Sequence, residues 1–139
     1  MLFFLSTLYT LTSLSPSPVR KATLTVEVQH IQDLRGQVQI GLFASATGFP
    51  GKAKPVQAKS VKASHNTVEA VFEVEPGTYA LAVYHDVNGN GKIDKKLFGI
   101  PIEPYGFSNN VRPRFSSPSF NDCKVRVGEG GKAISIQVK

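Results

Sequence analysis

The sequence predicts an all-β fold, an antiparallel β-sandwich of the immunoglobulin-like or prealbumin-like kind, with about seven strands and a long loop after the fifth. Two observations support this prediction. After residue 20, apolar residues alternate with polar ones, as at Leu24, Val26 and Val28, and no segment shows a convincing helical period. Turn-forming residues such as Pro76 and Gly77 separate the alternating runs.

The first half of the domain is expected to contain four strands, because apolar and polar residues alternate there and turn signals divide the runs. Arg35-Gly36 divides the first pair of strands, and His65-Asn66 divides the second pair. The expected strands are residues 23–30, 37–44, 56–63 and 67–74.

The fifth strand, residues 78–85, is apolar on both faces, with Leu81 and Val83 on one face and Ala80 and Ala82 on the other. Such a strand is expected in the middle of a sheet, where both faces are covered. Two more strands, residues 122–128 and 132–138, flank a glycine-rich turn and are expected to form a closing hairpin.

The composition suits one domain of modest size, which we place at residues 22–139 of the 139-residue chain. The formal net charge is +6, yet the basic residues are scattered, so no stripe for nucleic acid is expected. A basic surface of this kind favours loose contact with anionic envelope polymers. The single cysteine, Cys123, allows no intramolecular disulfide, and its alternation with Val125 predicts a small buried residue.

The N-terminal residues 1–21 read as a signal-peptide-like or disordered segment. Residues 2–14 form an apolar run that is shorter than the roughly 20 residues of a membrane span and fits the apolar core of a secretory signal. The Ser-Pro repeat at residues 15–18 then breaks any helix, and no basic residue precedes the apolar run. We therefore expect a periplasmic or secreted protein, without a transmembrane span in its mature domain.

The stretch that follows the fifth strand resembles the front half of a calcium-binding loop. Oxygen-bearing groups fall at alternate positions, and a glycine, Gly91, stands sixth. The expected metal ligands are Asp86, Asn88, Asn90, the backbone carbonyl of Lys92, and Asp94.

This loop departs from an EF-hand at its twelfth position, where Leu97 replaces the bidentate glutamate. Glu103 and Asp122 are the candidates for a closing ligand. With few carboxylates and nearby lysines, calcium is expected to bind weakly, at roughly 10⁻⁴ to 10⁻³ M. The alternative is a surface turn of asparagine, aspartate and glycine residues held by side-chain to backbone hydrogen bonds.

The segment of residues 86–121 is the longest irregular part of the chain, and such segments are usually functional. Its aromatic, amide and guanidinium groups predict contact with an envelope or extracellular protein or glycan. The partner-binding candidates are Tyr105, Phe107, Asn109, Asn110 and Arg112. The alternative is that the aromatic residues plug one end of the sandwich and the asparagines cap turns.

Five segments of this region also carry a family resemblance. They are Gly77-Thr78-Tyr79-Ala80-Leu81-Ala82-Val83-Tyr84-His85-Asp86, Asn88-Gly89-Asn90-Gly91-Lys92-Ile93-Asp94, Gly99-Ile100-Pro101, Tyr105-Gly106-Phe107-Ser108-Asn109-Asn110 and Pro118-Ser119-Phe120. Together they closely resemble the bacterial domain-of-unknown-function family 2141. The resemblance implies a β-sandwich and an envelope or extracellular location, and it implies no activity. Residues 77–94 also resemble transthyretin-like and carboxypeptidase-regulatory-like sandwiches.

These patterns predict a non-catalytic exported domain that binds calcium and an envelope partner. One alternative is a hydrolase-type enzyme that uses His85, Asp86 and Glu103, although adjacent strand residues such as His85 and Asp86 point to opposite faces. Another alternative is a purely structural or adhesive module without a ligand.

Overall fold

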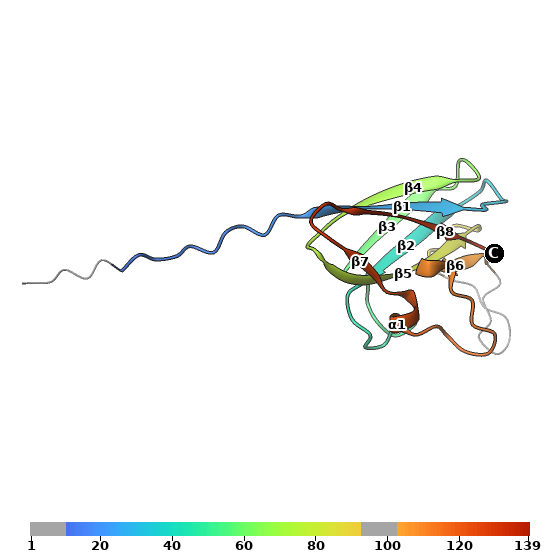
Figure 1. The fold of residues 1–139 in the computed structure, drawn as a ribbon. Coiled ribbons are helices and arrows are strands. Elements are labelled where there is room, and N and C mark those ends of the chain that lie inside the picture. Colours follow the sequence, from blue (N-terminus) through green and yellow to red (C-terminus); the bar gives the residue numbers. More distant parts are fainter. Residues whose placement is uncertain (1–10, 93–102) are drawn as a thin grey trace, which may run out of the picture.

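The computed structural model describes residues 11–92 and 103–139, and its regular structure is almost entirely β (Figure 1). This confirms the predicted all-β sandwich. The described strands are β1 (Ala22–Gln29), β2 (Gln37–Phe43), β3 (Gln57–Lys62), β4 (Val68–Val74), β5 (Gly77–Asp86), β6 (Tyr105–Phe107), β7 (Val125–Val127) and β8 (Lys132–Gln137). Within residues 11–92 and 103–139, two short helical turns accompany them, η2 (Ser108–Asn110) and α1 (Phe120–Cys123).

The strands form two sheets that face each other. One sheet has the order β4-β1-β8, and the other has the order β3-β2-β5-β6, with β7 also paired to β5. The central position of β5 is as predicted, since β2 pairs with it on one side while β6 and β7 take successive stretches of it. All pairings are antiparallel within the described residues except that of β1 with β8, which is parallel.

The predicted closing hairpin is wrong. β7 pairs with β5 in one sheet, whereas β8 pairs with β1 in the other, so the turn at Gly128 and Gly131 carries the chain across the sandwich. The observed strand β7 also starts later than the predicted strand 122–128, because residues Phe120–Cys123 form α1. Alternation in a sequence shows which face of a strand is buried, but it does not identify the partner strand.

The core lies between the two sheets and consists of the inward-facing residues that alternation selects. In β1 the buried residues include Leu24, Val26 and Val28, each 0% exposed, and β5 contributes Leu81 and Val83. Cys123 is buried and unpaired, as the sequence predicted, and burial raises the pKa of its thiol to about 11. No helix in the described part of the chain is long and apolar enough to cross a membrane.

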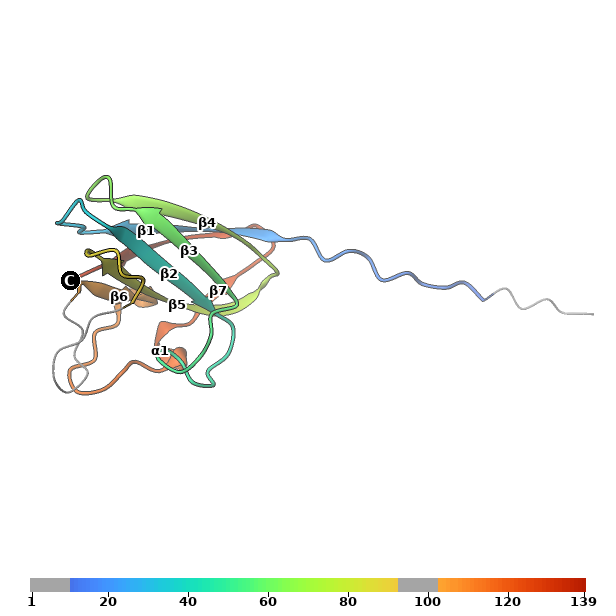
Figure 2. The same ribbon diagram turned by 180° about the vertical axis from the view of Figure 1, so that it is seen from behind.

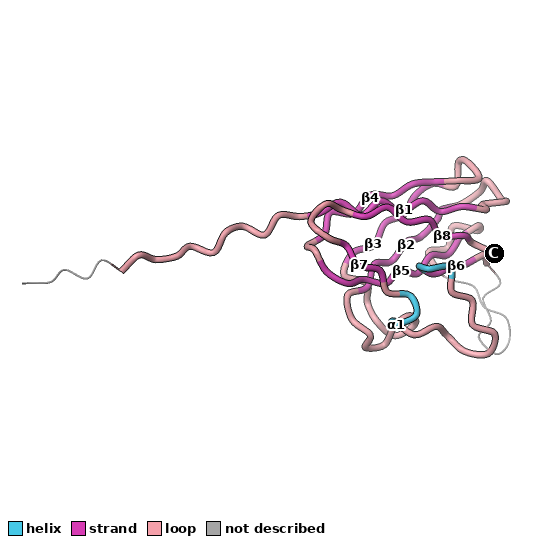
Figure 3. Tube along the Cα trace, in the orientation of Figure 1, coloured by secondary structure: helices cyan, strands magenta, loops and turns pink. Residues whose placement is uncertain are grey.

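The two ends of the sandwich differ. β1 starts at the end where the N-terminal segment joins, and residues 11–21 of that segment have no regular structure (Figures 1 and 2). The last residue of β5, Asp86, and the C-terminus lie at the opposite end. Figure 3 shows the loops of residues 44–56 and 111–119 lying with α1 on one side of the strands, where the rings of Phe49 and Phe120 are 5.9 Å apart.

Candidate functional site

The candidate site lies at the end of β5, where two acidic residues are buried. The β5–β6 ladder pairs Tyr84 with Tyr105, and the His85 N–H donates to the Pro104 carbonyl at 2.8 Å, which extends the ladder by one residue. Continuing this register by one more residue would set Glu103 opposite Asp86. Directly opposite residues of antiparallel strands lie on the same face, with Cβ atoms about 5 Å apart. Asp86 is 1% exposed and Glu103 is 8% exposed.

The loop after β5 winds around the Asp86 carboxylate. One Asp86 oxygen accepts the Gly91 N–H at 2.7 Å, and the other accepts the Asn90 N–H at 3.2 Å. Asn88 Oδ1 also accepts the Asn90 N–H, at 3.1 Å, and Asn90 Oδ1 accepts the Lys92 N–H at 2.9 Å. These are the side-chain to backbone bonds of an Asx-rich turn.

Left-handed glycines make this tight winding feasible. Gly89 and Gly91 have φ of 70° and 74°, a conformation that residues with a Cβ adopt only with strain. The Tyr84 hydroxyl donates to the Gly91 carbonyl at 3.2 Å and fixes the loop against β5. The expected metal ligand Asp94 lies outside the described residues, as does Leu97.

Within the described residues, no group of three or more histidine, cysteine, aspartate or glutamate side chains is placed to hold a metal ion. One of the two candidate closing ligands, Asp122, is engaged elsewhere, because it forms a capping box with Ser119 at the start of α1. Of the two candidates, Glu103 is the one next to the β5–β6 ladder, one residue before Pro104, whose carbonyl accepts the His85 N–H.

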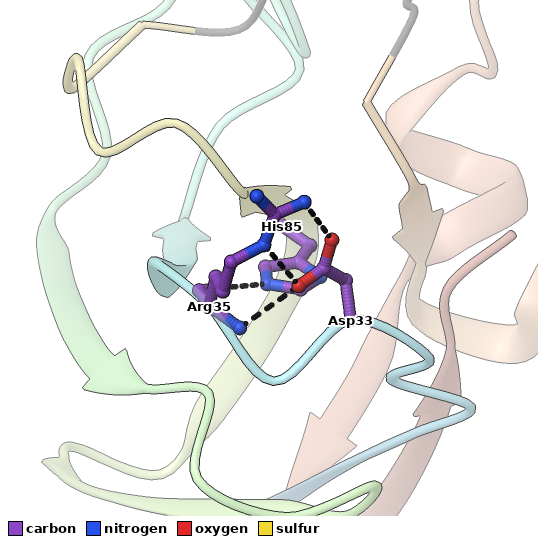
Figure 4. A network of polar contacts seen from close by, with 3 residues as sticks. All are labelled: Asp33, Arg35 and His85. Carbon is purple, nitrogen blue, oxygen red and sulfur yellow. Dashed lines mark hydrogen bonds and ion pairs between the residues drawn. The ribbon is translucent and has the colours of Figure 1, made fainter.

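His85 lies on the opposite face of β5 from Asp86, because adjacent strand residues alternate between the two faces. Its side chain is 0% exposed, and Nε2 is 2.7 Å from the Arg35 carbonyl oxygen (Figure 4). The Nδ1 atom has no hydrogen-bond partner within the described residues. His85 and Asp86 of the hydrolase alternative therefore do not share a face of β5.

The β1–β2 loop covers His85 and carries an exposed ion pair. Arg35 donates to both Asp33 carboxylate oxygens, with the closest N···O distance 2.6 Å (Figure 4). The hydrogen bond from the Arg35 guanidinium lowers the pKa of Asp33 below its ordinary value. Both side chains are exposed enough that the pair contributes little to stability.

The polar partner-binding candidates make hydrogen bonds inside the domain. Asn109 Nδ2 donates to the carbonyls of Asp122 and Lys124, at 3.0 Å each. Asn110 Oδ1 accepts the Gln137 N–H at 2.9 Å, which ties η2 to β8. Asn110, with φ of 53°, thus connects the two sheets, whereas Asn109, with φ of 62°, ties η2 to the segment that joins α1 to β7.

Arg112 is held in the same way. Its guanidinium donates to the Tyr105 carbonyl and stacks 5.0 Å from the centre of the Tyr105 ring. A longer contact of 3.4 Å reaches the Gln137 carbonyl on β8. The arginine therefore clamps the end of β6 to β8, and Tyr105 and Lys139 exchange backbone hydrogen bonds beside it.

The aromatic candidate Phe107 belongs to a cluster of rings on the outer side of β5. The Phe49 ring lies 6.3 Å from Phe107, 5.2 Å from Phe43 and 5.9 Å from Phe120, in edge-to-face geometry. Such contacts stabilise the packing of loops on a sheet. By contrast, Phe115 is 99% exposed and contacts the solvent with its whole ring.

Sequence reasoning missed Ser108, the most deeply engaged polar residue of this region. Its side chain is 0% exposed, accepts the Leu81 N–H at 2.9 Å and donates to the Cys123 carbonyl. It fills the gap along β5 between the stretch paired with β6 and the stretch paired with β7. The available signal was its position in the Tyr105–Asn110 block, inside a run of turn-forming residues.

The fold and this end of the molecule define a class, a small bacterial-type β-sandwich with an Asx-rich loop at one pole. A family model confirms the resemblance seen in the sequence: the chain belongs to the family described as "Uncharacterized protein conserved in bacteria (DUF2141)", which matches residues 26–135. No curated protein and no solved structure matches the chain.

Proposed function

We propose that this protein is a non-catalytic, exported β-sandwich module that binds one calcium ion weakly at the Asp86 end and an envelope or extracellular partner through residues 86–121. The observation that supports the calcium site best is the burial of two carboxylates, Asp86 and Glu103, at the end of β5 beside a tightly wound loop, where the continued β5–β6 register would set them opposite each other. A divalent cation there would offset the repulsion between them.

The loop chemistry is compatible with calcium. Calcium takes about six to eight oxygen ligands, including carboxylate, amide and backbone oxygens. A carboxylate oxygen has two lone pairs, so the hydrogen bonds that Asp86 accepts from Asn90 and Gly91 leave it capacity for a cation. Lys92 brings positive charge to the same loop, which favours weak binding.

Thermal unfolding in a calcium titration tests this proposal, with magnesium as the comparison ion. If the dissociation constant is about 1 mM, 10 mM calcium stabilises the fold by about 1.4 kcal/mol, which raises Tm by roughly 3–8 °C. Asp86→Asn and Glu103→Gln are expected to remove most of this shift, and exposed Glu129→Gln should keep it. No shift at millimolar calcium would refute the metal site.

Export is supported by the exposed segment that precedes β1. Leu11 and Leu14 are 95% and 92% exposed and have no place in the core, as expected for a segment that does not belong to the folded domain. We expect cells to release or export the domain with a mature N-terminus near residues 20–23. Fractionation with N-terminal sequencing measures this, and full-length protein in the cytoplasm would contradict it.

The partner surface is best represented by the loop of residues 111–119. Its exposed side chains include Arg114 and Phe115, which combine a cation with an unburied aromatic ring. We propose that an anionic envelope polymer or protein contacts this loop. Co-sedimentation with purified cell-wall polymer should fall for Phe115→Ser and for Arg114→Gln, and it should weaken with salt. Equal binding by both variants would argue for a structural module without a ligand at this loop.

A further inference from the structure

The loop after β5 contains two Asn-Gly pairs, Asn88-Gly89 and Asn90-Gly91, which differ in the hydrogen bond of the glycine N–H. Asparagine followed by glycine is the sequence most prone to deamidation, because glycine offers little steric resistance to ring closure. Both asparagines are exposed, and both following glycines have positive φ. The two pairs therefore form a natural matched comparison within a few residues.

In each pair the electrophile is the side-chain amide carbon of the asparagine, and in both pairs the amide oxygen accepts a backbone hydrogen bond. Asn88 Oδ1 accepts the Asn90 N–H at 3.1 Å, and Asn90 Oδ1 accepts the Lys92 N–H at 2.9 Å. A donor on the amide oxygen stabilises the negative charge that forms there when a nucleophile attacks the amide carbon. Each asparagine amide oxygen thus has a backbone N–H donor.

The nucleophiles are not alike. The Gly91 N–H donates to the buried Asp86 carboxylate at 2.7 Å, a charge-assisted bond. The Gly89 N–H makes no hydrogen bond within the described residues, and the space around Gly89 is open. Loss of the proton from the Gly91 nitrogen is disfavoured beside a carboxylate, and attack by that nitrogen would break its hydrogen bond to Asp86. Neither penalty applies to the Gly89 nitrogen.

We infer that Asn88 is a site of spontaneous deamidation in the folded protein and that the Asp86 carboxylate protects Asn90. In the reaction the Gly89 nitrogen loses its proton to solvent base and forms a bond to Asn88 Cγ. The Cγ–Nδ2 bond breaks, and ammonia leaves. Water then opens the succinimide at either carbonyl to give aspartate or isoaspartate, with no change in oxidation state. Each product adds a negative charge to the loop.

Peptide mapping by mass spectrometry of the full-length protein, incubated folded at mildly alkaline pH, tests this inference. We expect Asn88 to react about tenfold faster than Asn90, because a hydrogen bond to a charged group is large enough to change a rate by that factor. In urea, which removes the Asp86 contact, the two rates should converge. Equal rates in the folded protein, or the same Asn88 preference in urea, would overturn the inference.

A variant gives an independent measurement. Asp86→Ala removes the acceptor of the Gly91 N–H, so Asn90 should react at a rate close to that of Asn88. Circular dichroism establishes whether the variant is folded, and Glu129→Ala serves as an exposed acidic control that should leave both rates unchanged. A folded Asp86→Ala protein with slow Asn90 would contradict the protective role of Asp86. If the variant does not fold, the inference is tested by the Asn88 and Asn90 deamidation rates of the wild-type protein, compared between the folded and the urea-treated state.

Discussion

Ser108→Ala is the substitution whose effect follows most directly from the structure. The Ser108 hydroxyl is 0% exposed and joins three parts of the fold: it follows β6, accepts the Leu81 N–H of β5 and donates to the Cys123 carbonyl ahead of β7. Alanine fits the same space but leaves the Leu81 donor and the Cys123 acceptor without this partner. The change therefore isolates hydrogen bonding from packing.

The expected loss follows from the cost of burying unsatisfied groups. An unsatisfied buried donor or acceptor costs about 1–3 kcal/mol. Two such groups, partly relieved by relaxation, give an expected loss of about 2–4 kcal/mol in the free energy of unfolding. This is a large part of the roughly 5–15 kcal/mol that stabilises a typical domain.

Urea unfolding followed by circular dichroism measures the loss. We expect the midpoint to fall by roughly 1–2 M while the slope of the transition stays the same, since the surface exposed on unfolding does not change. Ser117→Ala, in an exposed loop position, should stay within about 0.5 kcal/mol of wild type. A Ser108→Ala loss smaller than that would refute the assigned bridging role.

Two further predictions concern backbone packing and a buried thiol. Gly106→Ala should cost more than about 1 kcal/mol in urea unfolding, because a Cβ there would clash with the Gln137 carbonyl, whereas Gly130→Ala has open space. Similar losses for both would contradict this. Cys123 should resist alkylation until urea is added, since burial and then the Asp122 charge raise its pKa to about 11. Because the folded pKa is the higher one, wild type should lose stability relative to Cys123→Ala as pH rises from about 9 toward 11; an unchanged difference would refute this.

Much of the architecture was predictable because alternation is a strong signal in half-buried strands. In β1, β2 and β4, fully buried residues alternate with partly or fully exposed ones almost without exception. β6 was missed because three residues, including Gly106, are too short to show a period. The parallel pairing of β1 with β8 depends on where a glycine turn sends the chain, which a local pattern does not encode.

The candidate site was only partly predictable. Alternate oxygen-bearing residues and Gly91 correctly indicated a tightly wound loop, and the bonds from Asn88 and Asn90 to the backbone are those of the Asx-rich alternative. Whether Glu103 can approach Asp86 depends on the β5–β6 register across a long connection, so the spacing of the sequence alone leaves it open. The hydrogen bonds that Asn109 makes inside the domain could not be predicted, because they depend on where Asp122 and Lys124 lie in space.

The position of the chain's two ends has a practical consequence. β1 starts at the pole away from Asp86, and its eight residues span about 26 Å. A fluorophore, bead or surface linker placed before Ala22 would sit at that far pole and leave the loop free to sample the medium. The same attachment at Lys139 would crowd Tyr105, with which Lys139 shares two backbone hydrogen bonds. Probes are therefore better attached at the N-terminal side of Ala22.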